Sequence, residues 1–218
     1  MRLMNSLKAA CAVAILASAV AGVATSASAQ EAAFKTKSAG DFLIRGRLVG
    51  VVPDEDVKSG DLAGQGKVDD DYIPEVDFSY FITDNIALEL IAGTSKHDVK
   101  WNTGSSELDL GTVRLLPPTL TAQYHFMTQE RFSPYVGAGI NYTFFYDEKP
   151  GQMTSVKYDD GFGFALQAGF DFAISGPWSL NVDVKKIFLD TDVTVNNSIK
   201  ADADLDPWLF GVGVGYRF

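Results

Sequence analysis

The sequence has little cysteine, little histidine and no excess of positive charge. Its 218 residues include one cysteine, Cys11, and two histidines, His97 and His125. A disulfide scaffold and a zinc site built from cysteine pairs are therefore excluded. Lysine and arginine together number 18 against 28 acidic residues, a formal net charge of −10. A nucleic-acid binder needs a basic face to neutralise phosphates, so we expect no nucleic-acid partner.

Long apolar runs are confined to the N-terminus. A positively charged start leads into an apolar run over 9–24, and the small residues of 27–29 (Ala-Ser-Ala) follow in the pattern that signal peptidase cleaves. We therefore predict a cleaved signal peptide over 1–29. No later stretch approaches 18 consecutive apolar residues, so the sequence predicts no transmembrane helix after the leader.

The predicted mature domain, 30–218, alternates between large apolar and small or polar residues with a period of two, which is typical of β-strands. Eight segments share this alternation: 41–53, 76–82, 86–92, 112–126, 136–144, 162–172, 180–184 and 208–218. Short links between them alternate with long, polar links near 54–72, 95–111, 147–161 and 190–204. The pattern predicts an all-β fold, an eight-stranded antiparallel up-and-down transmembrane β-barrel with both termini at the plain, periplasmic end.

The chemistry of the two strand faces separates a membrane barrel from a soluble β-sandwich, which also alternates. One face of each segment is large and apolar, while the opposite face mixes charge with glycine. A soluble strand buries its apolar face and exposes its charges to water. A barrel in a bilayer does the reverse, so the sequence favours the membrane barrel.

Five short stretches spread over nearly the whole mature chain carry a further signal; they are Leu43-Ile44-Arg45-Gly46-Arg47, Leu116-Pro117-Pro118-Thr119, Pro134-Tyr135-Val136-Gly137-Ala138-Gly139, Lys185-Lys186-Ile187, and the ending from Asp206-Pro207-Trp208 to Tyr216-Arg217-Phe218. Together they resemble the OmpW family of small outer-membrane proteins. The resemblance implies an eight-stranded barrel in the bacterial outer membrane that passes small hydrophobic molecules. We expect outer-membrane lipid and lipopolysaccharide as neighbours. The terminal aromatic Phe218 resembles the signal that the barrel-assembly machinery reads.

The predicted inward face is rich in charge. An eight-stranded barrel is wide enough only for its own side chains or one small ligand, so buried charges must pair there. We predict that a plug of ion pairs fills the lower lumen, formed by Arg45, Arg47, Glu89, Asp171, Asp183, Lys185 and Arg217. The carboxylates of Glu75 and Asp77 fall higher in the second strand on this assignment, and we expect them to line a polar entrance.

The upper inward positions are apolar and predict a passage for small hydrophobic solutes, lined by Val49, Val51, Leu115, Phe145 and Leu189. Beside it, Pro117 and Pro118 interrupt the fourth strand. Because proline donates no backbone hydrogen bond, the pair should weaken the ladder on both sides of that strand. We therefore predict a lateral gap through which an apolar molecule leaves the barrel for the bilayer.

Two other functions remain open. A structural or loop-presenting barrel, such as an adhesin or receptor, would not transport and would have a lumen packed solid to the top. A lipid-modifying enzyme would need a nucleophile and a base. His97 has Ser95 and Asp98 close by, but such neighbours rarely form a triad, and we expect His97 in a solvated loop. We predict no catalytic residue, no metal site and no cofactor. The sequence leaves the oligomeric state open.

Overall fold

The computed structural model describes residues 33–54, 56–59, 65–103, 106–196 and 198–218, so the leader predicted for 1–29 lies outside the described residues. No described segment forms a helix long and apolar enough to cross a membrane. The described residues form fourteen strands: β1 (Phe42–Val52), β2 (Asp56–Ser59), β3 (Gln65–Val68), β4 (Asp71–Phe81), β5 (Ile86–Gly93), β6 (Ser95–Asn102), β7 (Glu107–Leu116), β8 (Thr119–His125), β9 (Phe132–Pro150), β10 (Val156–Tyr158), β11 (Gly161–Ser175), β12 (Trp178–Val195), β13 (Ile199–Asp204) and β14 (Trp208–Arg217).

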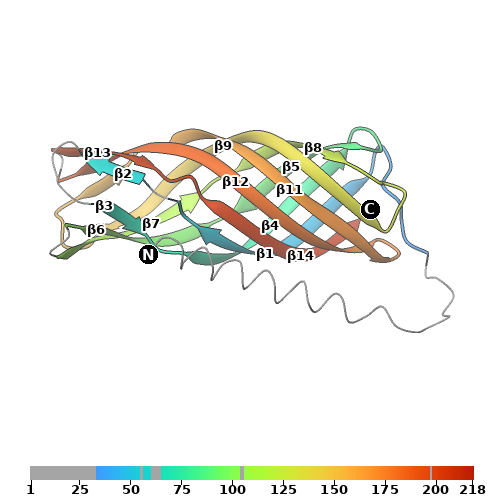
Figure 1. The fold of residues 1–218 in the computed structure, drawn as a ribbon, viewed down its shortest axis with the longest axis horizontal. Coiled ribbons are helices and arrows are strands. Elements are labelled where there is room, and N and C mark those ends of the chain that lie inside the picture. Colours follow the sequence, from blue (N-terminus) through green and yellow to red (C-terminus); the bar gives the residue numbers. More distant parts are fainter. Residues whose placement is uncertain (1–32, 55, 60–64, 104–105, 197) are drawn as a thin grey trace. The chain divides into compact units, whose positions relative to one another are not determined.

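Eight of these strands close a ring (Figure 1). Each is antiparallel to the next in the order β1, β4, β5, β8, β9, β11, β12 and β14, and β14 pairs again with β1. A closed ring has no edge strand whose backbone N–H and C=O groups would face hydrocarbon. The predicted eight-stranded antiparallel barrel is confirmed.

The remaining strands lengthen the barrel at one end. β6 continues β5 and pairs with β7, and β3 pairs with β6. On the opposite wall, β12 pairs with β10 and β13, and β13 pairs with β2. Figure 1 shows β2, β3, β6 and β13 gathered at this end, which we call the outer end, with the C-terminus at the opposite, inner end. The prediction of long loops between the strands was therefore wrong for much of their length, because the hairpins continue to pair beyond the eight-stranded ring.

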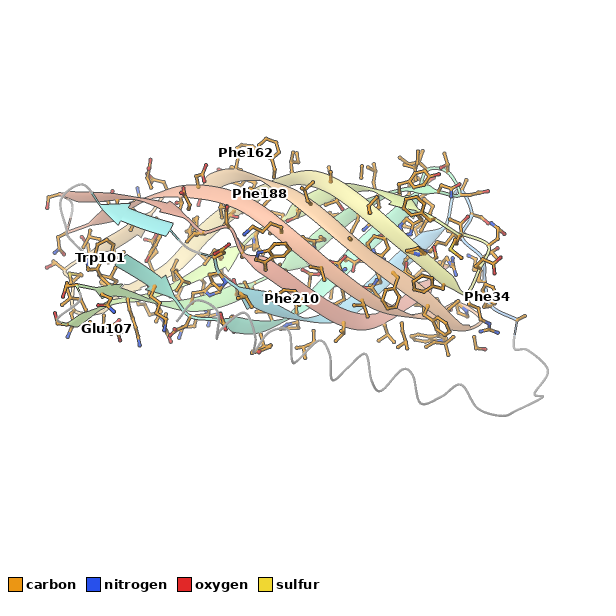
Figure 2. All side chains as sticks on the ribbon, viewed as in Figure 1. Phe34, Trp101, Glu107, Phe162, Phe188 and Phe210 are labelled. Atoms are coloured by element: carbon orange, nitrogen blue, oxygen red, sulfur yellow. The ribbon has the colours of Figure 1, made fainter. Side chains whose placement is uncertain are left out.

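One face of the barrel wall is exposed and the other is buried, as the alternation predicts. Large apolar side chains are exposed on the outside, with Phe78 47% and Leu90 49% exposed, and Figure 2 shows Phe162 projecting from the outer surface. In contrast, the inward side chains of Arg45 and Glu89 are 0% exposed. At the level of Arg45 and Glu89 the charged residues thus lie inside and the large apolar residues outside, as a barrel surrounded by lipid requires.

A row of glycines in β14 lets this wall lie against the arginines of β1. A Cβ added to Gly213 would meet the Gly46 carbonyl oxygen at 2.1 Å and the Cγ of Arg47 at 2.7 Å. The first contact is with backbone, which cannot rotate away. The absent side chain therefore makes room both for strand pairing and for the stem of Arg47.

We expect Gly213→Ala to destabilise the barrel by about 1–3 kcal/mol or more, the usual cost of overpacking. Gly46 is the matched control, because a Cβ added there meets nothing within 4 Å. Gly46→Ala should change the stability by less than about 0.5 kcal/mol. Urea titration of both variants folded in detergent micelles measures the difference. Equal stabilities would show that β14 moves away from β1 at little cost.

Candidate functional site

Arg45 on β1 is the centre of a buried network that crosses the lumen. Its Nε donates to Oδ1 of Asp77 at 2.9 Å and its Nη2 to Oε1 of Glu89 at 2.7 Å. Its Nη1 lies 3.3 Å from Oδ1 of Asp171, which comes from the far wall on β11. All four side chains are buried. One guanidinium therefore joins carboxylates from β4, β5 and β11, which suits the fixed fork of five donors that arginine offers.

Arg47, two residues further along β1, forms a second layer. Its Nη2 lies 2.9 Å from both Glu75 Oε1 and Asp77 Oδ2, and its Nη1 lies 3.7 Å from Asp183 Oδ1. The expectation that Glu75 and Asp77 line a polar entrance was wrong. The antiparallel register sets Asp77 opposite Arg45 and Glu75 opposite Arg47, so these carboxylates lie at the height of the arginines.

Neutral side chains satisfy one further oxygen each of Glu89 and Asp183. Glu89 Oε2 accepts from Thr121 and from Gln167, each at 3.0 Å. The Tyr135 hydroxyl donates to Asp183 Oδ2 at 2.8 Å. A buried carboxylate is tolerated only when its oxygens have partners, so these contacts make the charged network compatible with the interior.

Residues 34–41, just before β1, cross the inner end and add a cation that the sequence analysis missed. Nζ of Lys37 donates to Asp171 Oδ2 at 2.9 Å and to Ser133 Oγ at 2.8 Å, and it lies 2.7 Å from His125 Nδ1. Burial lowers the pKa of Lys37 to about 8, although the neighbouring Asp171 carboxylate opposes the shift. Strand periodicity gives no signal for Lys37, because it lies outside every strand.

Two cations predicted for the plug lie at its margins. Arg217 donates to the Lys35 carbonyl, and its Nε lies 4.0 Å from Asp41 Oδ2. It therefore belongs to the contacts of the N-terminal segment, and among the described residues it forms no ion pair with the carboxylates of the two arginine layers. Lys185 lies at the upper side, with Nζ 4.0 Å from Glu75 Oε2 and 3.9 Å from Asp183 Oδ1.

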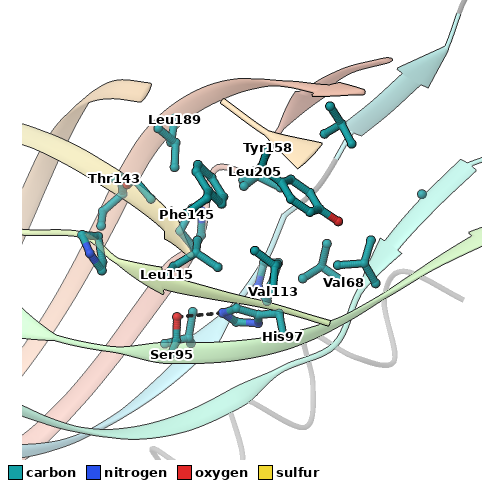
Figure 3. A pocket seen from close by; sticks show the side chains of 18 of the residues that line it. Val68, Ser95, His97, Val113, Leu115, Thr143, Phe145, Tyr158, Leu189 and Leu205 are labelled. Atoms are coloured by element: carbon teal, nitrogen blue, oxygen red, sulfur yellow. Dashed lines mark hydrogen bonds between the residues drawn. The ribbon is translucent and has the colours of Figure 1, made fainter. Parts of the chain in front are cut away.

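An apolar cavity of about 140 Å³ lies on the outer-end side of the charged network, because its lining includes Glu75 and Lys185 of the network as well as residues of β3, β6 and β7. Figure 3 shows part of its wall. Val51, Leu115, Phe145 and Leu189 line it, as the predicted passage residues should. Val49 is buried in the cluster that also contains Val51 and Leu189. Four of the five residues predicted for the passage therefore lie on the cavity wall, and Val49 lies in the adjoining apolar cluster.

Much of the cavity wall comes from the outer-end strands and was missed. Val113, Tyr158 and Leu205 all line the cavity, and all lie in or beside segments that were expected to be loops. The Phe145 and Tyr158 rings stack, with centroids 5.5 Å apart. The sequence held a signal for this strand pairing. In β6, the buried residues alternate with outward neighbours, as in a strand; they are Ser95, His97, Val99 and Trp101.

His97 is not in a solvated loop, which corrects the sequence expectation. It lies on β6 with 4% of its surface exposed and lines the cavity together with Ser95. Its Nε2 lies 3.0 Å from Ser95 Oγ, and its Nδ1 lies 3.0 Å from the backbone oxygen of Asp69. Asp98 is on the opposite, exposed face. Among the described residues, no group of three or more His, Cys, Asp and Glu side chains is placed to hold a metal ion.

The wall of the cavity has a break in its ladder beside Pro117 and Pro118. The β5–β8 ladder reaches Ile91 opposite Thr119, and the β6–β7 ladder resumes at Ser95 opposite Leu115. Within the described residues, no backbone pair joins 92–94 to 116–118.

The ladder is interrupted on both sides of the proline pair, as the sequence predicts, but the interruption towards β9 is smaller: pairing stops at Leu116–Phe144 and resumes at Thr119–Asn141. Towards β9, the Tyr142 N–H donates to the Pro118 carbonyl at 3.1 Å. The physical reason is that proline lacks an N–H but keeps its carbonyl. Pro117 also lines the cavity, so the break lies beside the apolar space.

Comparisons with known proteins agree with this architecture. An uncharacterised outer-membrane protein, y4mB of Sinorhizobium fredii, is 46% identical over 185 residues, which cover 80% of this chain and 79% of the relative. Outer membrane protein W of Vibrio cholerae is 33% identical, with 91% and 98% covered. The crystal structure of OprG from Pseudomonas aeruginosa matches with a TM-score of 0.79 at 33% identity, over 85% of this chain and 99% of that one.

A more distant relative is the dibenzothiophene metabolism operon protein PahQ of Pseudomonas aeruginosa, 27% identical over 159 residues that cover 71% of this chain and 75% of the relative. OprG is an outer-membrane protein whose structure resembles the barrel seen here, and the family model described as the OmpW family matches residues 38–218. The chain therefore belongs to the OmpW family and is a β-barrel of the bacterial outer membrane.

Proposed function

We propose that this barrel gives small hydrophobic molecules a passive route through the outer leaflet of the outer membrane. The observation that carries the proposal is the position of the apolar cavity, which lies directly above a charged network and beside a break in the wall. A solute would enter at the outer end, rest in the cavity and leave sideways into the bilayer.

The cavity has the size and lining that such a solute needs. Its volume of about 140 Å³ is close to that of an engineered apolar cavity in another protein that binds benzene, about 150 Å³. Transfer of the solute from water to lipid would supply the driving force, about 25 cal/mol for each Å² of apolar surface removed from water. The route needs no cofactor and no energy source.

The charged network makes an axial exit unfavourable. Arg45, Arg47 and their carboxylates fill the lumen beneath the cavity, and each ion has its partners. An apolar molecule passing through would separate these pairs and could not replace their hydrogen bonds. Each ion left without its partner would cost several kcal/mol. The break between 92–94 and 116–118 offers a lateral exit instead, because no strand pairing of the described residues has to be broken there.

The relative PahQ supports the class of solute, since its name connects it with dibenzothiophene, a flat aromatic molecule with almost no polar surface. The competing proposal, a structural or loop-presenting barrel, predicts a lumen packed solid to the top. The cavity favours transport over that alternative. Recognition of Phe218 by the barrel-assembly machinery and contact with lipopolysaccharide stay predictions. Phe218 is 63% exposed, which leaves it accessible.

Uptake of naphthalene tests the proposal. Cells lacking their own copy are compared with cells that express this chain, at low external concentration, and internal naphthalene is followed by its fluorescence. We expect faster entry when the barrel is present. Sucrose is the control solute, and its entry should be unchanged because the lumen is filled by ion pairs. Equal naphthalene uptake with and without the barrel would contradict the proposal.

A further inference from the structure

We infer that Ser95 and His97 form a polar subsite in the cavity wall that prefers small apolar solutes carrying one neutral hydroxyl group, such as phenols and medium-chain alcohols. The inference rests on the proposed function and deepens it, because it names a solute class within the hydrophobic molecules. It starts from a polar pair that the charged network does not use.

The hydrogen bonds of the pair fix which groups donate. The backbone oxygen of Asp69 can only accept, so Nδ1 of His97 carries a proton and donates to it across 3.0 Å. In a neutral imidazole, Nε2 is then the acceptor and takes the proton of the Ser95 hydroxyl, also across 3.0 Å. Ser95 Oγ has therefore given up its donor and keeps lone pairs that can accept. A ligand that donates one hydrogen bond fits this arrangement.

The surroundings of the pair are apolar. Leu115 lies directly opposite Ser95 in the β6–β7 ladder, and Val113 lies opposite His97. Figure 3 shows the pair on the cavity wall with Leu115 and Val113, while Phe145 and Leu189 lie further across the space. A hydroxyl bound to Ser95 would thus have its hydrocarbon body against Leu115 and Phe145. Ser95 is also the first paired residue beyond the wall break, so the bound solute would lie beside the proposed exit.

The charges beneath the cavity favour a neutral ligand over an anion. Four cations of the network, Lys37, Arg45, Arg47 and Lys185, face five carboxylates, Glu75, Asp77, Glu89, Asp171 and Asp183. The formal sum is −1, and Lys185, the cation that lines the cavity, is already shared between Glu75 and Asp183. A carboxylate ligand would add a further negative charge in a poorly solvated space.

The pair also resembles a nucleophile with its base, but the geometry favours binding over acyl transfer. Such chemistry needs donors placed at the oxyanion. The Trp101 indole N–H is buried and has no partner among the described residues. It belongs to a residue six positions along β6 from Ser95, about 20 Å away in an extended strand, too far to act on the same group.

Three solutes of one shape test the subsite: p-cresol, p-xylene and p-toluate. Their uptake is compared between the wild type, Ser95→Ala and Ser95→Thr, with Ser106→Ala as the control for an exposed serine on the same hairpin. We expect Ser95→Ala to lower p-cresol uptake about three- to tenfold, the size of one hydrogen bond, and to leave p-xylene unchanged. Ser95→Thr, which keeps the hydroxyl, should retain most of the p-cresol uptake.

A direct readout comes from the ¹⁵N signals of the His97 imidazole in lipid nanodiscs. We expect p-cresol to shift the Nε2 signal and p-xylene to leave it almost unchanged. The inference is overturned if Ser95→Ala affects p-cresol and p-xylene equally, or if p-toluate is taken up best and is insensitive to Ser95. Failure of p-xylene itself to enter through the wild-type barrel would instead refute the proposed function. The two failures are therefore distinguishable.

Discussion

Arg45→Ala is expected to lower the free energy of unfolding by about 3–5 kcal/mol, the usual cost of removing one partner from a buried ion pair. The substitution leaves Asp77, Glu89 and Asp171 facing each other in a lumen where all three are buried. Their mutual repulsion and missing hydrogen bonds then count against the folded state. Urea titration of the barrel in lipid vesicles, followed by tryptophan fluorescence, measures the loss.

Arg114→Ala is the matched control for this prediction. Arg114 also forms an ion pair, with its Nε 3.3 Å from Asp147 Oδ2, but the two side chains are 44% and 41% exposed. Removal of this exposed pair should cost less than about 1 kcal/mol. If Arg45→Ala and Arg114→Ala lose similar amounts, the buried network does not stabilise the barrel in the way described here.

A disulfide across the wall break is expected to slow naphthalene uptake about tenfold or more, equivalent to about 1.4 kcal/mol on the barrier. The ladders on both sides of the break share one register, which sets Thr94 opposite Leu116, and both side chains are exposed. Thr94→Cys with Leu116→Cys can therefore bridge the gap. The sequence has one cysteine, Cys11, within the predicted leader, so no other thiol competes in the mature chain. Reduction should restore uptake.

The control pair lies four residues away along the same two walls, on the inner side of the break, where the ladder is intact. Leu90 pairs with Leu120, and their side chains are 49% and 45% exposed. Leu90→Cys with Leu120→Cys should close without changing uptake. If uptake through the oxidised Thr94–Leu116 variant equals that of the reduced form, the lateral exit is ruled out.

A noncovalent variant covers the case in which the gap is too wide for a disulfide, with Cα atoms more than about 7 Å apart. Pro117→Thr with Pro118→Val restores two backbone donors and should likewise slow the uptake of apolar solutes, because the ladder can then close. Unchanged uptake at equal protein levels would also rule out the exit.

The eight-stranded ring and the inward and outward faces could be read from the sequence. Alternation with a period of two is a local property, so the positions of Arg45, Glu89 and Asp171 on the inward face follow from counting along each strand. Because the large apolar face points outward and the charged face points inward, the sequence also predicted that lipid surrounds the barrel. The inward positions of Val49, Val51 and Leu189, which are buried in the structure, follow from the same counting.

Only the tertiary structure decided at which height along the barrel the inward side chains lie and how the strands pair at the outer end. The level of Glu75 and Asp77 depends on their register against β1, and the burial of His97 depends on the pairing of β6 with β7. The entry of Lys37 into the lumen depends on a segment outside the strands. Each of these is a contact between distant parts of the chain. The alternation along one strand carries no information about these contacts, because the partner strand sets the register and the length of the hairpin.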